Sequence, residues 1–280
     1  MFQQLNVAAI SFVPTKFDLE SNANQLEDIF RQAAAKGAQL ALGPEGVLEG
    51  YVVNEIIAGE VSAKQMRDVA LSLKSPVINR FRALARELNM CLAFGLAEAI
   101  DKDVYNCAVF IDQTGRIRGK YHKMQLAEGY HASWWFNRLG KNSRAFQTPY
   151  GRAGFLICND RWNADIARIP VLDGARYLLI PSFGSCSKAQ DKAVLARARE
   201  NGVPIIEANV GVTLIISQGE IVARSRKQTT ITYGTIDIPA PPSKQNRDAH
   251  EQTFLNWRKK EMPARYKQTQ IKKRARSQSK

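Results

Sequence analysis

Three segments of the chain each place a potentially reactive side chain at the end of an apolar, strand-like run. Cys158 closes the run 153–157 and is followed by polar residues and then a helical pattern. A thiol at a strand end beside a helix N-terminus can have a lowered pKa and an accessible sulfur. Glu45 and Lys123 end two earlier strand-like runs. Glu, Lys and Cys in this order and context indicate the active site of a hydrolase.

Each of these residues also has a simpler interpretation when it is taken alone. A single cysteine in an apolar run is commonly a small core residue. Glu45 could lie in a surface loop, and Lys123 could be a solvated lysine in a basic strand. The joint occurrence of all three in matching contexts favours the catalytic interpretation.

Composition is that of an ordinary globular protein, and we expect it to act without a metal or organic cofactor. The 280 residues are 45% hydrophobic and 24% charged, and no apolar run approaches the ~18 residues that a membrane span requires. The N-terminus lacks the basic start of a signal peptide. Four cysteines without CxxC spacing and only three histidines argue against a zinc site. Free thiols fit a reducing setting, so we expect a cytoplasmic protein without a membrane partner.

The net charge of +14 is concentrated in the C-terminal part of the chain. Residues 243–280 hold 12 Lys and Arg against 3 Asp and Glu, and they follow a Pro-rich stretch that ends at residue 242. We therefore predict a domain over 1–242 and a basic extension over 243–280, of which 271–280 should be disordered. The extension could contact nucleic acid or another polyanion weakly, or it could be a solubilising tail.

Apolar periodicity predicts strands and helices intermixed along the whole domain. The expected helices are 24–36, 76–89, about 163–172 and 188–201. The expected strands are 5–12, 40–42, 90–97, 104–111, 117–122, the run ending at Cys158, 177–180, 204–208, 212–217, 220–223 and 229–236. Strands and helices mixed in this way indicate a layered α/β fold in which helices cover the sheets.

The chain resembles the nitrilase superfamily, the carbon–nitrogen hydrolases with a Glu-Lys-Cys triad, from about residue 5 to residue 238. The segments that carry the resemblance are Gly43-Pro44-Glu45 with Gly50-Tyr51, the run 115–126, the Cys158 segment, 196–201 with 208–209, and 218–223. The family's register selects Lys123 and not Lys120. The resemblance implies an αββα sandwich, a homodimer or larger homo-oligomer, and hydrolysis of a non-peptide C–N bond.

The resemblance also implies roles for individual residues. Cys158 would form a thioester, Glu45 would move the protons, and Lys123 would stabilise the oxyanion with help from a backbone N–H near Asn159. Glu128 is the only carboxylate between Lys123 and Cys158. Related enzymes use a second Glu in this interval to position substrate or water, so Glu128 is a candidate for this role. The alternative is a Glu in a surface loop. Two aromatic residues, Tyr51 and Trp134, are candidates for the substrate pocket, and Trp134 could instead lie at a subunit contact.

Arg161 bears on the choice of substrate. The string from Ile157 to Trp162 resembles the branch that hydrolyses N-carbamoyl amino acids, in which Arg binds the substrate carboxylate. Here one Arg precedes the Trp where that branch has two, and Arg161 could instead pair with Asp160 or Asp165. We predict hydrolysis of a small amide or N-carbamoyl compound. The alternatives are an acyltransferase that uses the same thioester and a catalytically silent scaffold with a polyanion-binding tail.

Overall fold

The computed structural model describes residues 3–241 and 247–278, in which strands and helices are interspersed. The strands are β1 (Gln3–Ser11), β2 (Leu40–Leu42), β3 (Cys91–Ile100), β4 (Asp103–Ile111), β5 (Ile117–His122), β6 (Phe146–Thr148), β7 (Gly151–Phe155), β8 (Tyr177–Ser182), β9 (Ile205–Asn209), β10 (Val212–Ser217), β11 (Glu220–Ser225) and β12 (Thr230–Ile238). The α-helices are α1 (Leu19–Ala35), α2 (Val53–Ala58), α3 (Met66–Val69), α4 (Pro76–Leu88), α5 (Ala164–Leu172), α6 (Lys188–Asn201) and α7 (Asp248–Gln278). Two 3-10 helices, η1 (Ala63–Gln65) and η2 (Cys158–Trp162), complete the set.

The strands of the described residues form two sheets of six strands each. The first sheet has the order β12-β1-β2-β3-β4-β5, and the second has the order β11-β10-β9-β8-β7-β6. In both sheets the central strands are parallel and the outer strands antiparallel. Because parallel strands are covered on both faces, every residue of β8 and β9 is buried and neither strand shows the alternation of a half-exposed strand.

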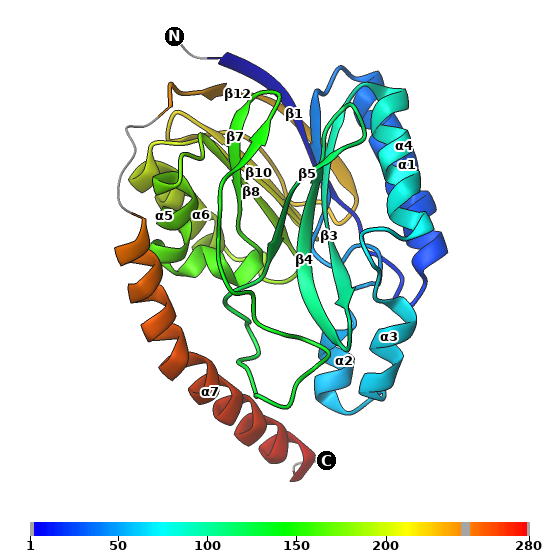
Figure 1. The fold of residues 1–280 in the computed structure, drawn as a ribbon, viewed down its shortest axis with the longest axis vertical. Helices are drawn as coiled ribbons and strands as arrows, with labels where there is room; N and C mark the ends of the chain where they lie inside the picture. Colours follow the sequence, from blue (N-terminus) through cyan, green and yellow to red (C-terminus); the bar gives the residue numbers. More distant parts are fainter. Residues whose placement is uncertain (1–2, 242–246, 279–280) are drawn as a thin grey trace.

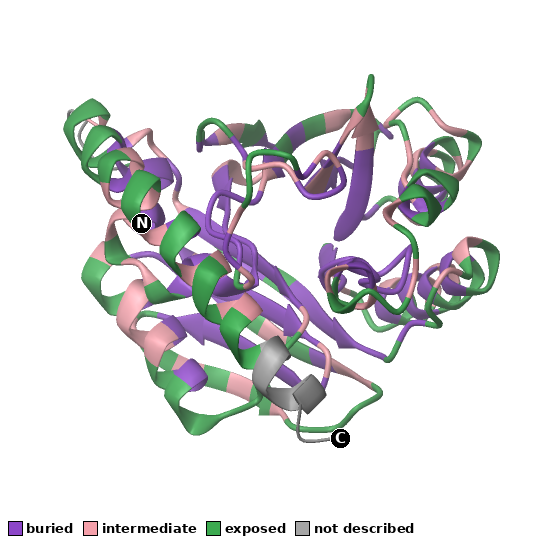
Figure 2. Ribbon diagram, turned by 90° about the horizontal axis from the view of Figure 1, so that it is seen from below, coloured by how far each residue is buried: buried purple, intermediate pink, exposed green. Residues whose placement is uncertain are grey.

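The two sheets lie face to face, and helices cover their outer sides (Figure 1). Helices α1 and α4 lie against the first sheet, where a separate apolar cluster joins them to the strands, and α5 and α6 lie against the second. Seen from below, buried residues fill the strands and the helix faces turned toward them (Figure 2). The αββα sandwich that the sequence predicted is therefore confirmed.

Helix α4 shows how the sequence sets a helix boundary. The Ser75 side chain accepts a hydrogen bond from the backbone N–H of Ile78, and Pro76 occupies the first helical position. Asn89 ends the helix in the left-handed conformation that Asn tolerates better than most residues. The face that carries Ile78 and Phe81 is buried against the first sheet.

The C-terminal helix α7 is the main departure from the predicted organisation. Disorder was expected for 271–280, whereas α7 continues to Gln278. The predicted domain boundary at 242 and the last two residues of the chain lie outside the described residues. Phe254 and Met262 of α7 are buried, and the helix contacts α5 and then the loop that follows β5. Among the described residues, no helix combines the length and the apolarity needed to cross a bilayer.

Candidate active site

Glu45 and Lys123 meet at one end of the first sheet. Glu45 follows β2 and Lys123 follows β5, and both side chains are fully buried. The Lys123 ammonium donates to Glu45 Oε1 at 2.6 Å, and the Asn106 side-chain amide donates to the same oxygen at 2.7 Å. The backbone N–H of Phe183, just beyond β8, donates to Glu45 Oε2 at 2.9 Å. These three contacts fix the carboxylate between the two sheets.

Cys158 enters the same space from the second sheet. It opens η2 directly after the β7 run, and its φ of 45° lies in the left-handed region that non-glycine residues rarely adopt. Asp160 holds this tight turn, because its carboxylate accepts from the backbone N–H of Ile157 at 2.8 Å and of Gln125 at 2.9 Å. The Tyr121 hydroxyl also donates to Asp160 at 2.8 Å. The thiol is held beside Glu45 and Lys123, and 7% of the residue is exposed.

The electrostatic surroundings keep the thiol protonated and the lysine charged. Burial and the neighbouring Glu45 raise the pKa of Cys158 to about 11, while Lys123 and Arg161 oppose this rise. Burial alone lowers the pKa of Lys123, but the charges of Glu45, Cys158 and Glu128 together hold it above its usual value. Nucleophilic attack therefore requires a group that removes the thiol proton. Glu45 is a neighbouring carboxylate, and Lys123 holds it in place.

Glu128 joins this group, as the sequence suggested. Its Oε1 accepts from the Tyr51 hydroxyl at 2.9 Å, and the Tyr51 ring is stacked on Phe183 with 5.0 Å between centroids. The Lys123 ammonium lies 5.8 Å from the centroid of the Tyr51 ring. The second oxygen of Glu128 is buried and has no hydrogen-bond partner among the described residues. A substrate N–H could bind there.

Arg161 is placed differently from the sequence-based expectation. It is 1% exposed and forms an ion pair with the buried Glu207 of β9, so neither Asp160 nor Asp165 is its partner. Its Nη1 also donates to Ser182 at 3.0 Å, and its Nη2 lies 3.4 Å from the sulfur of Cys158. Because Glu207 already balances the guanidinium, the assignment of Arg161 to a substrate carboxylate loses its support.

Asn159 and Trp134 lie at the margins of the site. The Asn159 side chain donates to the Gln125 carbonyl at 3.2 Å and its own carbonyl accepts from the Gln125 amide, so it ties η2 to the loop after β5. Trp134 is buried in an apolar cluster that includes Tyr51, and its ring contacts Tyr266 of α7. Their contacts lie with Gln125 and with this apolar cluster, so we expect both side chains to support the loops around the site.

Sequence reasoning missed three contributors to the site. Asn106 and the backbone N–H of Phe183 both bind Glu45, and Glu207 balances Arg161. A buried glutamate within the apolar strand 205–209 is the one signal that could have been noticed, since a charge in such a run needs a partner. The other two depend on sheet geometry.

Residues 6–241 of the sequence match the carbon–nitrogen hydrolase family. The chain belongs to the carbon–nitrogen hydrolase family. This carbon–nitrogen hydrolase is 30% identical over 219 residues to an N-carbamoylputrescine amidase from Oryza sativa subsp. japonica, covering 76% of this chain and 68% of that one. It is 28% identical over 200 residues to a citrullinase from Francisella tularensis subsp. tularensis, covering 67% and 68% of the two chains.

A solved structure of similar shape agrees with this membership. An amidase from Nesterenkonia sp., with acrylamide added at its active-site cysteine, superposes with a TM-score of 0.71. The superposition covers 90% of this chain and 99% of that chain at 22% sequence identity. The likeness concerns the fold. This structure confirms the predicted fold, and the family match with the curated relatives confirms the predicted superfamily and the prediction of an enzyme that hydrolyses C–N bonds.

Proposed function

We propose that this carbon–nitrogen hydrolase cleaves an amide or N-carbamoyl group of a small molecule through a thioester on Cys158. The observation that carries the proposal is the convergence of Glu45, Lys123 and Cys158 from two sheets into one buried space. An amide carbonyl is a poor electrophile, so a covalent intermediate divides one difficult hydrolysis into two easier steps.

The geometry supports a role for each group. Glu45 takes the thiol proton as the sulfur attacks the carbonyl carbon, and it passes that proton to the leaving amine. Lys123, held at 2.6 Å from Glu45, provides the positive charge that stabilises the oxyanion of the tetrahedral intermediate. Glu45 then activates the water that hydrolyses the thioester, which restores the free thiol of Cys158.

The substrate is proposed to be rich in N–H donors and to need no carboxylate. The buried, unpartnered Oε2 of Glu128 offers an acceptor for a primary amide or ureido nitrogen. Arg161 is balanced by Glu207, so a substrate carboxylate has no free guanidinium to meet there. The relatives named above as N-carbamoylputrescine amidase and citrullinase support an N-carbamoyl group as the reacting part.

Ammonia release by the purified protein tests the proposal. The panel contains N-carbamoylputrescine, citrulline, N-carbamoyl amino acids and simple carboxamides, with Cys158→Ala as the blank. We expect release that depends on Cys158 and does not require a carboxylate. Equal release by wild type and Cys158→Ala would refute the mechanism, and activity confined to N-carbamoyl amino acids would refute the interpretation of Arg161.

A further inference from the structure

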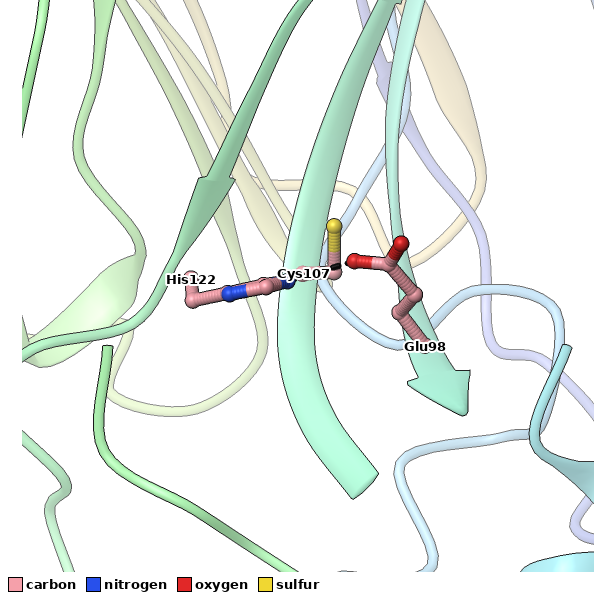
Figure 3. Close-up of side chains that lie close together, drawn as sticks. All are labelled: Glu98, Cys107 and His122. Carbon is pink, nitrogen blue, oxygen red and sulfur yellow. Dashed lines mark hydrogen bonds and ion pairs between the residues drawn. The ribbon is translucent and has the colours of Figure 1, made fainter. Parts of the chain in front are cut away.

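A second cluster of reactive side chains lies on the outer side of the first sheet. Glu98 of β3, Cys107 of β4 and His122 of β5 bring one carboxylate oxygen, one sulfur and one ring nitrogen within 4.8 Å of one another. Figure 3 shows the three side chains converging from three adjacent strands. Glu98 and Cys107 are buried, and His122 is partly buried. The proposed hydrolysis uses none of them.

Strand register explains why these residues meet although they are 9 and 15 positions apart in sequence. Cys107 pairs with Leu96 of β3 and with His122 of β5, and Glu98 lies two residues beyond Leu96. Because side chains alternate between the faces of a strand, all three point to one face. Tyr105 shares that face and stacks on the His122 ring with 4.3 Å between centroids, which fixes the orientation of the imidazole.

The chemistry of the three groups is that of a transition-metal site. A thiolate, an imidazole and a carboxylate are the ligands that Zn²⁺ binds in proteins, and three protein ligands leave a fourth position open to water. A hollow of about 370 Å³, lined in part by His122, Lys120 and Lys141, gives solvent access beside the cluster. The Cys107 thiol lies 3.5 Å from the Ala108 carbonyl oxygen, and burial together with the neighbouring Glu98 carboxylate holds its pKa well above the usual value.

Lys120 already places a positive charge beside Glu98. Its ammonium donates to Glu98 Oε1 at 2.8 Å, and His122 Nε2 lies 2.5 Å from Glu98 Oε2. The Lys120 side chain is 43% exposed, so it can swing into solvent without opening the core. The cluster is thus assembled before any metal arrives, and a mobile lysine neutralises its carboxylate.

We propose that Glu98, Cys107 and His122 form a binding site for a divalent cation of the zinc class. As the cation binds, a sulfur–metal bond replaces the S–H bond of Cys107 and the thiol proton passes to solvent. Lys120 leaves Glu98 with its charge intact, and His122 binds through a ring nitrogen whose proton, where it carries one, also passes to solvent. No oxidation or reduction takes place.

The proposed metal site stands back to back with the active site. Asn106 and Lys123, which both bind Glu45, are the chain neighbours of Cys107 and His122 and point to the opposite face of the sheet. The backbone N–H of Lys123 donates to the Asn106 carbonyl at 2.9 Å, so one stretch of β4 and β5 carries both sets of side chains. A cation on the outer face would therefore contact the strands that hold Glu45.

Cobalt titration tests the site directly. Co²⁺ is added to the full chain with Cys158→Ala, which removes the active-site thiol, and a thiolate-to-cobalt charge-transfer band is followed in the near ultraviolet. We expect one equivalent to bind and the band to disappear with Cys107→Ser. His122→Gln should weaken binding at least tenfold. Lys120→Ala, which removes the competing ammonium, should tighten binding severalfold, an effect that a purely structural cluster would not produce.

Cys186→Ser is the matched control, because Cys186 is the exposed thiol of the chain. Its band should equal that of the parent. Circular dichroism checks that each variant is folded, and Lys120→Ala keeps the test informative if Cys107→Ser does not fold. The proposal is wrong if the parent shows no band, if the band depends on Cys186, or if it persists in folded Cys107→Ser.

Discussion

The buried pair of Arg161 and Glu207 should control the reactivity of the Cys158 thiol. Arg161 Nη2 lies 3.4 Å from the sulfur, and Nη1 of the same guanidinium pairs with Glu207. Replacing Arg161 alone would leave Glu207 as an unpaired buried charge, which costs about 3–5 kcal/mol and risks unfolding. The informative perturbation is therefore the double variant Arg161→Met/Glu207→Gln, which removes both charges together.

The magnitude follows from the geometry of that contact. A hydrogen bond to a charged group contributes about 1.5–3 kcal/mol, and 1.36 kcal/mol corresponds to about one pKa unit. The bare Coulomb attraction over 3.4 Å at an effective dielectric constant of about 20 is larger, about 5 kcal/mol, but Glu207 offsets part of it. We therefore expect the pKa of Cys158 to rise by about 1–2 units in the double variant. At fixed pH the thiolate fraction then falls by about 10–100-fold.

Alkylation by iodoacetamide at pH 8 measures this fraction without a substrate. A Cys186→Ser background removes the exposed thiol, and peptide mass spectrometry confirms that Cys158 carries the label. Ser182→Ala is the matched control, because it removes a neutral contact of Arg161 and should change the rate by less than about threefold. If the folded double variant is alkylated as fast as the background protein, Arg161 does not stabilise the thiolate and the reasoning fails.

Three further predictions concern catalysis, pH and helix docking. Glu45→Gln and Lys123→Met should each lower kcat for ammonia release by about 10²–10³-fold or more, because each removes a charge that acts in the transition state; turnover within tenfold of wild type would exclude that role. Burial raises the pKa of Glu49 to about 7, from 4.5 in the unfolded chain. The contribution of Glu49 to the free energy of unfolding is therefore complete below pH 4.5. This contribution is lost as the pH rises through 7, and the total loss is about 3 kcal/mol. Urea unfolding at pH 5 and pH 8 should show a smaller loss of stability between the two pH values in Glu49→Gln than in wild type. The same loss in both proteins would contradict this prediction. Gly129→Ala should lower the Tm more than Gly59→Ala. Both glycines have positive φ, but only at Gly129 would an added Cβ meet the backbone of α7, at 2.2 Å. Equal Tm values for the two variants would show that α7 does not pack against this loop.

The sequence predicted the sandwich well because its signals are local. Apolar periodicity located α4 to within one residue, whereas it placed the start of α1 five residues too late. The Ser75–Pro76 start of α4 is a local signature of a helix N-terminus. The three central site residues could be predicted because each follows a strand. The strands before Glu45 and Lys123 end at the same edge of the first sheet, and the family motif adds Cys158 from the second sheet. The motif order supplied what the periodicity could not, namely that Lys123 and not Lys120 faces Glu45.

The pairing of distant residues was beyond sequence reasoning. Glu207 and Arg161 meet only because β9 lies beside β8 and η2, and Glu98, Cys107 and His122 meet only through the register of three strands. Helix α7 was missed for a different reason: its charged and polar residues give little apolar periodicity, and its fold depends on contacts with α5 and with the loop after β5.

The pairing of β1 with β12 has a consequence for how the protein is made. Gln3 of β1 lies opposite Ile238 of β12, so the two partners are separated by nearly the whole domain. On a ribosome that adds about 5–20 residues per second, one edge of β1 waits roughly 10–45 s for its partner. During this time the strand that begins the chain exposes unpaired backbone groups to other nascent chains. Final closure of the first sheet, and with it a rigid frame for Glu45, is therefore a late event of biosynthesis, and any premature stop before Thr230 leaves β1 as an open edge.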